Sequence, residues 1–318
     1  MTQKDIVKSA VALKKPPRTP LYFCNRDIDK SDVIFTGYVP DPDFVPDIPG
    51  RTEWGYRSHS LDDTMGQPDL CPLEDSWEQL EGFKPPNPEV TERYRLIQPT
   101  IDENPDKYIV ANLGITGFNM ATFLRGFENF VMDIYIEEDN ANALLDIILG
   151  FEEQVCRHYC SFDIDAVAFF DDWGSQKNLL VSPEKWREFF KPRYKKQFDL
   201  IHSLGKKVFF HCCGQISDII PDLCEIGADI LNLNQPELFG IEEMGRLYGG
   251  KACFCCPVDH QTVALTGSRE EIFDYVRRLH ESLGSGFIGY IEDYRSCGMT
   301  DERYHDIVDA FMLLNSSL

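Results

Sequence analysis

The sequence has few basic residues for its size. Lys and Arg total 31 against 53 Asp and Glu, which gives a formal charge of -22. A surface of this sign repels phosphate backbones and anionic membranes. The chain also lacks any run near the roughly 18 apolar residues that span a bilayer, and residues 1–5 lack the apolar core of a signal peptide. We therefore expect a cytoplasmic protein that binds neither nucleic acid nor membrane.

The pattern of cysteines is not that of a disulfide framework. The count of 11 is odd, and several cysteines lie inside apolar runs of a chain of 318 residues, which needs no covalent stapling. Most are expected to be small buried side chains, and a few are candidate metal ligands. No Gly-x-Gly-x-x-Gly motif follows the first predicted strands, so a dinucleotide-binding fold has no support.

What the chain does contain is a regular alternation that begins at Tyr108. Short apolar runs alternate with amphipathic stretches, which is typical of buried strands joined by helices. The predicted strands cover residues 108–111, 166–170, 208–210, 230–233, 252–256 and 287–291. This alternation predicts an α/β fold with a parallel sheet and right-handed crossovers, either an open doubly wound sheet or a closed eight-stranded barrel.

The intervening helices are indicated by spacing and caps. Apolar residues recur at steps of three and four from Leu144 to Tyr159, and Ser182 caps a helix that Pro192 should kink. Ser268 and Glu271 form a capping box at the start of another helix.

The first hundred residues have a different composition. They are rich in Pro, Asp and turn signals, and only residues 21–23 suggest a short strand. We expect a single domain in which residues 1–106 form an irregular N-terminal extension that packs on a regular body of residues 107–318.

Polar side chains collect immediately after the predicted strands. In a barrel these positions share the C-terminal rim, where active sites of this fold are built. Asp171 and Asp172 are candidates for a general acid or base. They could instead hydrogen-bond the ligands of a metal and so adjust its properties, or form hydrogen bonds within the rim itself. The candidates for holding a polar substrate are Asn234, Asp259, Gln261 and Glu292.

One pair of these residues suits a metal. His211 and Cys213 are separated by one residue in an extended segment, so their side chains share a direction. Zinc favours imidazole and thiolate ligands, and a catalytic zinc keeps three protein ligands and one exchangeable position. Cys297 is the best-placed third ligand, with Cys255 or Cys256 as alternatives.

The chain resembles the uroporphyrinogen decarboxylase superfamily, and more narrowly its corrinoid-linked methyltransferase branch. The resemblance is looser before Tyr108, through residues 53–55 and 66–68, and continues from there onward. The segments that carry it are Phe169-Phe-Asp-Asp-Trp-Gly-Ser-Gln, Ser182-Pro-Glu-Lys-Trp-Arg-Glu-Phe, His211-Cys-Cys-Gly-Gln-Ile-Ser-Asp and Gly227-Ala-Asp-Ile-Leu-Asn.

The resemblance implies a (β/α)8 barrel, a TIM barrel, with its site at the C-terminal mouth. It also implies a Zn2+ held by His211, Cys213 and Cys297. The branch transfers a methyl group between a corrinoid protein, or methylcobalamin, and a small molecule such as a thiol or a methoxy or methylamine compound. No cobalamin-binding Asp-x-His-x-x-Gly motif is present in the chain, so the corrinoid is expected on a partner protein.

Two other functions remain open at this point. One is a cofactor-free decarboxylase of a uroporphyrinogen-like tetrapyrrole, and the other is a non-catalytic protein that binds a tetrapyrrole or a methyl carrier. The decarboxylase uses an N-terminal segment with two arginines, whereas Cys-Asn-Arg-Asp-Ile-Asp after Phe23 has one arginine and two acids. A polyanionic substrate is therefore disfavoured, and methyl transfer is the leading expectation.

Overall fold

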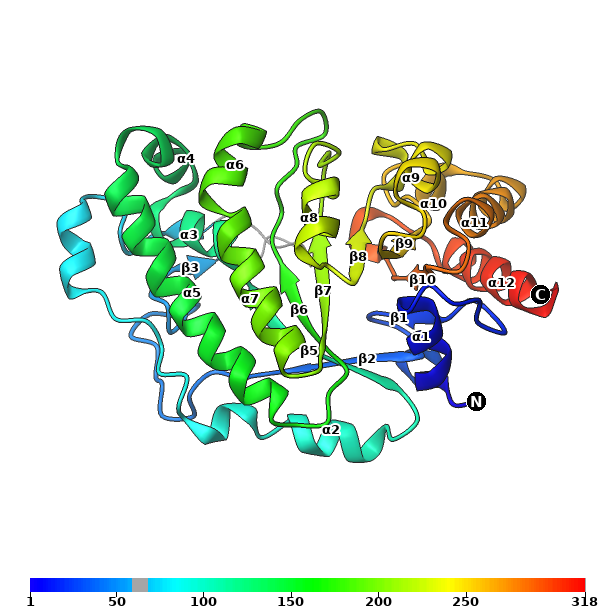
Figure 1. Cartoon of the computed structure of the whole chain (residues 1–318), viewed down its shortest axis with the longest axis horizontal. Coiled ribbons are helices and arrows are strands. Elements are labelled where there is room, and N and C mark those ends of the chain that lie inside the picture. The colour runs from blue at the N-terminus through cyan, green and yellow to red at the C-terminus, as the bar shows by residue number, and fades with distance from the viewer. Residues whose placement is uncertain (59–67, 318) are drawn as a thin grey trace.

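The computed structural model describes residues 1–58 and 68–317, so the resemblance at residues 66 and 67 lies outside the described part. Eight strands form one sheet in the order β1-β10-β9-β8-β7-β6-β5-β2, and every paired neighbour is parallel. Helices surround this sheet (Figure 1). The (β/α)8 barrel is confirmed, and the open doubly wound alternative is excluded.

The strands predicted from apolar runs are all present, those at 166–170, 230–233 and 287–291 with the predicted bounds and the others with shifted ends, and one more barrel strand lies in the first hundred residues. Residues 33–37 were not predicted as a strand because Pro-rich and Asp-rich segments surround them. The barrel strands are β1 (Leu21–Phe23), β2 (Val33–Gly37), β5 (Tyr108–Ile115), β6 (Ala166–Phe170), β7 (Lys207–Cys212), β8 (Ile230–Leu233), β9 (Cys253–Pro257) and β10 (Phe287–Ile291); β3 (Arg57–Ser58) and β4 (Pro68–Leu70) form a separate antiparallel pair. The part expected to be an irregular extension therefore supplies two strands of the barrel.

The two helix starts predicted from caps, after Ser182 and after Ser268, are both confirmed. The predicted kink is a break at Phe190 between α6 and α7, and the capping box of Ser268 precedes α11. The helices are α1 (Gln3–Val11), α2 (Ile97–Glu103), α3 (Gly117–Arg125), α4 (Phe127–Ile136), α5 (Glu138–Cys160), α6 (Pro183–Phe189), α7 (Lys191–Ser203), α8 (Ile220–Ile226), α9 (Ile241–Tyr248), α10 (Val263–Thr266), α11 (Arg269–Leu283) and α12 (Asp301–Ser317). Among the described residues, no helix is long and apolar enough to cross a bilayer.

Alternation along each strand divides the core into two parts. Tyr22, Ala168 and Phe209 belong to a buried cluster inside the barrel, whereas Val167 and Phe210 belong to the larger cluster between sheet and helices. On each strand, the next inward-facing residue after these, two positions further along the chain, lies at the carboxyl end of the strand. These residues form the mouth of the barrel.

The barrel closes between β1 and β2 through one backbone hydrogen bond, from the N–H of Asp32 to the carbonyl of Leu21 at 2.8 Å, and through side chains. The carboxylate of Asp32, which is 1% exposed, accepts a hydrogen bond from the N–H of Leu21 at 2.8 Å. It also forms a bidentate pair with Arg18 at 2.6 and 2.7 Å. The N–H of Phe23 donates a further hydrogen bond to Oγ of Ser31. These side chains satisfy backbone groups that a strand ladder would otherwise pair.

We expect Asp32→Ala to lower the free energy of unfolding by about 2–4 kcal/mol, because it leaves a buried N–H and a partly buried guanidinium unpaired. Urea denaturation measures the change. Asp29→Ala removes an exposed carboxylate of the same segment and should change stability by less than about 0.5 kcal/mol. Equal effects of the two substitutions would contradict the role assigned to Asp32.

Candidate metal centre

Three side chains of different chemistry meet at the barrel mouth. Asp172 follows β6, while His211 and Cys213 lie on alternate positions at the end of β7. The Sγ of Cys213 lies 3.6 Å from Nε2 of His211, and that nitrogen lies 3.7 Å from Oδ1 of Asp172. One ligand atom from each residue falls within 4.8 Å of the other two. The structure thus brings His211 and Cys213 together, as their spacing predicts, and adds Asp172.

The imidazole of His211 is oriented for binding. Its Nδ1 lies 2.7 Å from Oδ1 of Asn232, whose Nδ2 donates to the carbonyl of Cys255. Because that donation fixes the amide of Asn232, its oxygen faces the ring, so Nδ1 carries the proton and Nε2 offers its lone pair to the mouth. The ring of Phe170 stacks on the imidazole with centroids 4.7 Å apart. The histidine is held from two sides.

Asp172 orients the turn that carries Cys213. Its Oδ1 accepts a hydrogen bond from the N–H of Cys213 at 2.7 Å, and the next N–H, of Gly214, donates to Gln235. Gly214 has φ +80° and touches the backbone of Gly174, where a Cβ would not fit. Burial, and next the charge of Asp172, raise the pKa of the Cys213 thiol, so a cation that binds there displaces a proton.

The chemistry of this donor set fits zinc. Imidazole, thiolate and carboxylate are its three protein ligand types, and the second nitrogen of the histidine has the hydrogen bond that metal-binding histidines usually have. The hard cations Ca2+ and Mg2+ prefer oxygen ligands alone. Asp172, His211 and Cys213 form the one such group among the described residues.

Cys297 lies outside this group. It ends the 3-10 helix η5 (Arg295–Cys297), is exposed, and its Sγ lies 4.0 Å from the hydroxyl of Ser296. Cys255 fills the interior of the barrel, and Cys256 packs on its outer side. The third potential ligand atom beside His211 and Cys213 is therefore a carboxylate oxygen of Asp172, and Cys255, Cys256 and Cys297 lie outside this group.

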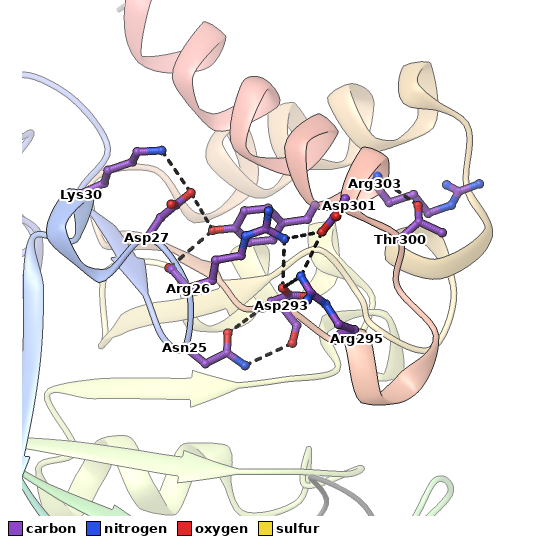
Figure 2. Close-up of polar contacts among 10 residues, drawn as sticks. Asn25, Arg26, Asp27, Lys30, Asp293, Arg295, Thr300, Asp301 and Arg303 are labelled. Carbon is purple, nitrogen blue, oxygen red and sulfur yellow. Dashed lines mark hydrogen bonds and ion pairs between the residues drawn. The ribbon is translucent and has the colours of Figure 1, made fainter.

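A network of charges fixes the segment that carries Cys297 (Figure 2). Arg26 donates to Asp293 at 3.1 Å and to Asp301 at 2.7 Å, and Arg295 donates to the same two carboxylates, each at 2.9 Å. The guanidinium of Arg26 lies 4.1 Å above the ring of Tyr304 in α12. We call these five residues the clasp. It joins the two ends of the 293–301 segment to the loop after β1.

Asp171 has a different environment from its neighbour. It is completely buried, and its carboxylate accepts hydrogen bonds from the N–H groups of Phe118 and Asn119 at the start of α3 and from the hydroxyl of Tyr194. Burial raises its pKa. Its oxygens are used by a helix N-terminus, so Asp172 is the one of the two that faces the mouth.

Sequence reasoning missed a second buried carboxylate at the same helix. Glu152 of α5 accepts a hydrogen bond from the N–H of Gly117 at 2.9 Å and one from Nε2 of Gln197 at 2.6 Å. Burial raises the pKa of Glu152 to about 7. The sequence pattern of α5 gives no sign of this role. Glu152 lies on the buried face of the helix, where the pattern leads one to expect only apolar residues.

The predicted substrate-binding residues are spread around the mouth. Asn234 is buried and its Oδ1 has no partner among the described residues. Asp259 is buried and accepts hydrogen bonds from Gln261 and Thr262 in its own turn, while the side chain of Gln261 is exposed. Glu292 accepts a hydrogen bond from the hydroxyl of Tyr290. None of these residues belongs to the metal group.

Comparisons with known proteins place the chain in a family. The profile of the uroporphyrinogen decarboxylase (URO-D) family matches residues 64–302, so the chain belongs to this family. No curated protein sequence matches it.

One solved structure confirms the architecture, and two others are reported as weaker similarities. A methyltransferase from Methanosarcina mazei superimposes with a TM-score of 0.75 at 16% identity, covering 98% of this chain and 99% of that one. A β-glucosidase from Pyrococcus furiosus reaches a TM-score of 0.46 at 12% identity, with 98% and 88% covered. A 3-keto-D-glucoside 4-epimerase from E. coli reaches 0.44 at 13% identity, with 70% and 84% covered.

The buried Glu152 generates a prediction for stability. Its folded pKa of about 7 exceeds the ordinary glutamate pKa of 4.5, so the folded state binds more protons between these values and stability falls as pH rises through that window. Glu152→Gln should reduce the loss of unfolding free energy between pH 5 and pH 8 by roughly 2–3 kcal/mol. Urea denaturation at pH 5 and pH 8 measures it.

The matched control is Glu153→Gln, which changes the neighbouring residue that pairs with Lys196 at the surface. It should reduce the dependence of stability on pH only slightly, because the charge of Glu153 makes the smallest contribution to the raised pKa of Glu152. The same slope in wild type and Glu152→Gln would show that this carboxyl does not titrate in the window.

Proposed function

We propose that the chain is a zinc-dependent methyltransferase that moves a methyl group between a corrinoid held by a partner protein and a small molecule. The observation that carries the proposal is the group of Asp172, His211 and Cys213 at the barrel mouth, with the imidazole oriented by Asn232. Family membership supports it, because the methyltransferase branch resembled by the sequence belongs to the same superfamily. The likeness to a methyltransferase from Methanosarcina mazei over the whole chain is consistent with it.

The residues that would hold zinc are His211 through Nε2, Cys213 through Sγ, and Asp172 through a carboxylate oxygen. Cys297 remains the alternative third ligand that the resemblance implies. When bound, zinc supplies a Lewis acid beside which a thiol is held as thiolate or a methylated oxygen or nitrogen is polarised. Three protein ligands leave one position for that group.

The other residues prepare this position. Asn232 keeps the proton on Nδ1 of His211, and Asp172 holds the backbone of Cys213. Asn234 and Glu292 present acceptor oxygens at the ends of β8 and β10, and we assign them to polar groups of the substrate. Asp171 receives no proton-transfer role, since helix α3 and Tyr194 use both of its oxygens.

The alternative of a tetrapyrrole decarboxylase is weakened by the clasp. Arg26 is the arginine of the segment that corresponds to the decarboxylase's arginine-bearing segment, and it already pairs with Asp293 and Asp301. A substrate with many carboxylates would have to compete with both acids for this cation. Methyl transfer makes no such demand.

We expect the purified protein to bind about one zinc per chain, and Cys213→Ser to lose it. Asn232→Ala should weaken zinc binding about 10- to 100-fold, because the imidazole loses its orienting bond. Competition with a chromophoric chelator measures both. Cys224→Ser is the control, as it changes a partly buried thiol of α8 away from the group.

Two further variants identify the third ligand. Asp172→Asn keeps an acceptor for the N–H of Cys213 but removes the charge, and Cys297→Ser removes the other candidate. Loss of zinc in one and retention in the other assigns the ligand. Full zinc content in Cys213→Ser would reject the metal centre itself.

Methyl transfer is tested by the absorbance of the cobalamin. Methylcobalamin with a thiol, or cob(I)alamin with a methylated donor, should change its cobalt state when the zinc-loaded protein is added, and the rate should fall at least about 100-fold in Cys213→Ser. Cys224→Ser should react as wild type does. No spectral change with any thiol, methoxy or methylamine compound would reject the proposed activity.

A further inference from the structure

A cavity of about 210 Å3 lies at the face of the barrel opposite the mouth. Its lining comes from the segment of residues 15–19 that leads into β1, from the end of α11, and from Phe287, the first residue of β10. The parallel strands β1 and β10 begin at this face and end at the mouth. The cavity is therefore a different site from the candidate metal centre.

The lining of this cavity is basic, although the chain as a whole has a formal charge of -22. It contains Lys15, Arg18 and His280, and no carboxylate of the described residues lines it. Within the described part of the chain, Lys15 forms no ion pair. An unpaired ammonium at a hollow without acids attracts anions.

Two carboxylates beside the lining are already paired. Asp32 accepts both terminal nitrogens of Arg18 at 2.6 and 2.7 Å. Glu281, which follows His280 in α11, accepts a hydrogen bond from Arg277 at 2.9 Å. Neither acid is left to occupy the cavity in place of an external anion.

Four donor groups of the lining are available to an occupant. They are Nζ of Lys15, Nε of Arg18, Nε2 of His280 and Oγ of Ser285. None has a hydrogen-bond partner among the described residues, and none belongs to the fully buried polar atoms that lack a partner, so each is accessible to solvent. An anion that enters the cavity can reach them.

The imidazole of His280 is held so that Nε2 is a donor. Its Nδ1 lies 3.1 Å from the hydroxyl of Thr19, which is 2% exposed. That hydroxyl has no other partner in the described part of the chain, so it donates to Nδ1, and the proton of the neutral ring is on Nε2. Burial lowers the pKa of His280, so the ring is neutral at pH 7. The positive charge of the site then comes from Lys15.

The segment that carries these donors is fixed in place. The side chain of Asn315 in α12 accepts a hydrogen bond from the N–H of Thr19 at 2.8 Å and donates to its carbonyl at 3.1 Å. The pair with Asp32 holds the guanidinium of Arg18. Only the exposed side chain of Lys15 must be ordered when an anion binds, which keeps the entropic cost small.

The size of the cavity and the number of donors suit a phosphate group. A phosphate offers at least three acceptor oxygens, whereas a carboxylate has two and would leave donors of the site without a partner. Lysine binds phosphate as a point charge. Sites for drug-sized ligands measure about 300–1,000 Å3, so a nucleotide is too large for this cavity.

We propose that this cavity is an anion site that binds a phosphate group, either as the free ion or as part of a small ester. The site goes beyond the proposed function and does not depend on it. The bound group joins residues 15–19 to the end of α11, beside the junction that Asp32 closes, and so stabilises the folded barrel.

Isothermal titration of the full chain with inorganic phosphate at pH 7 should show saturable binding, whereas sodium chloride of equal ionic strength should not. Lys15→Ala should weaken phosphate binding about tenfold and Ser285→Ala about threefold. Lys14→Ala is the matched control, because Lys14 is also exposed but does not line the cavity, and it should bind as wild type does. Phosphate should raise the unfolding midpoint of the wild type, and raise it less in Lys15→Ala.

Glycerol 2-phosphate, titrated in the same way, identifies the source of the group. Tighter binding than that of inorganic phosphate assigns the site to an ester, and equal or weaker binding assigns it to the free ion. Unfolding midpoints without phosphate establish that each variant is folded. The proposal is overturned by absence of saturable phosphate binding, by equal losses in Lys15→Ala and Lys14→Ala, or by acetate that binds as tightly as phosphate.

Discussion

The carboxylate of Asp32 closes the barrel at the junction of β1 and β2, where the two ends of the sheet meet. The first two strands are short and do not share a ladder, so a buried side chain and its bidentate arginine supply the missing bonds. In the closed barrel, the inward-facing side chains at the carboxyl ends of the eight strands form one ring around the mouth. The metal group and its orienting amide come from three neighbouring strands of this ring, β6, β7 and β8.

Two adjacent carboxylates show how alternation assigns roles. Asp171 points outward into the layer of helices, where backbone N–H groups of α3 and a tyrosine hydroxyl satisfy it. Asp172 points inward and lies beside His211 and Cys213. Neighbours in sequence thus serve opposite sides of the sheet, one holding a helix in place and the other completing a donor set.

Much of the architecture could be predicted, since apolar runs and caps are local. The strand at Val33–Gly37 could not, because turn-rich sequence surrounds it and only the pairing with β5 identifies it. The pair of His211 and Cys213 followed from spacing, whereas Asn232 and Glu152 act through contacts between elements distant in sequence. The location of Cys297 depends on ion pairs with Arg26, 271 positions earlier in the chain, which no local pattern encodes.

The clasp also bears on the order in which the protein is completed during synthesis. Asp301 and Tyr304 emerge from the ribosome after Cys297, while Arg26 emerges near the beginning. The pair of Arg26 and Asp293 can therefore form before Cys297 has been made, and the clasp is completed only when the start of α12 follows.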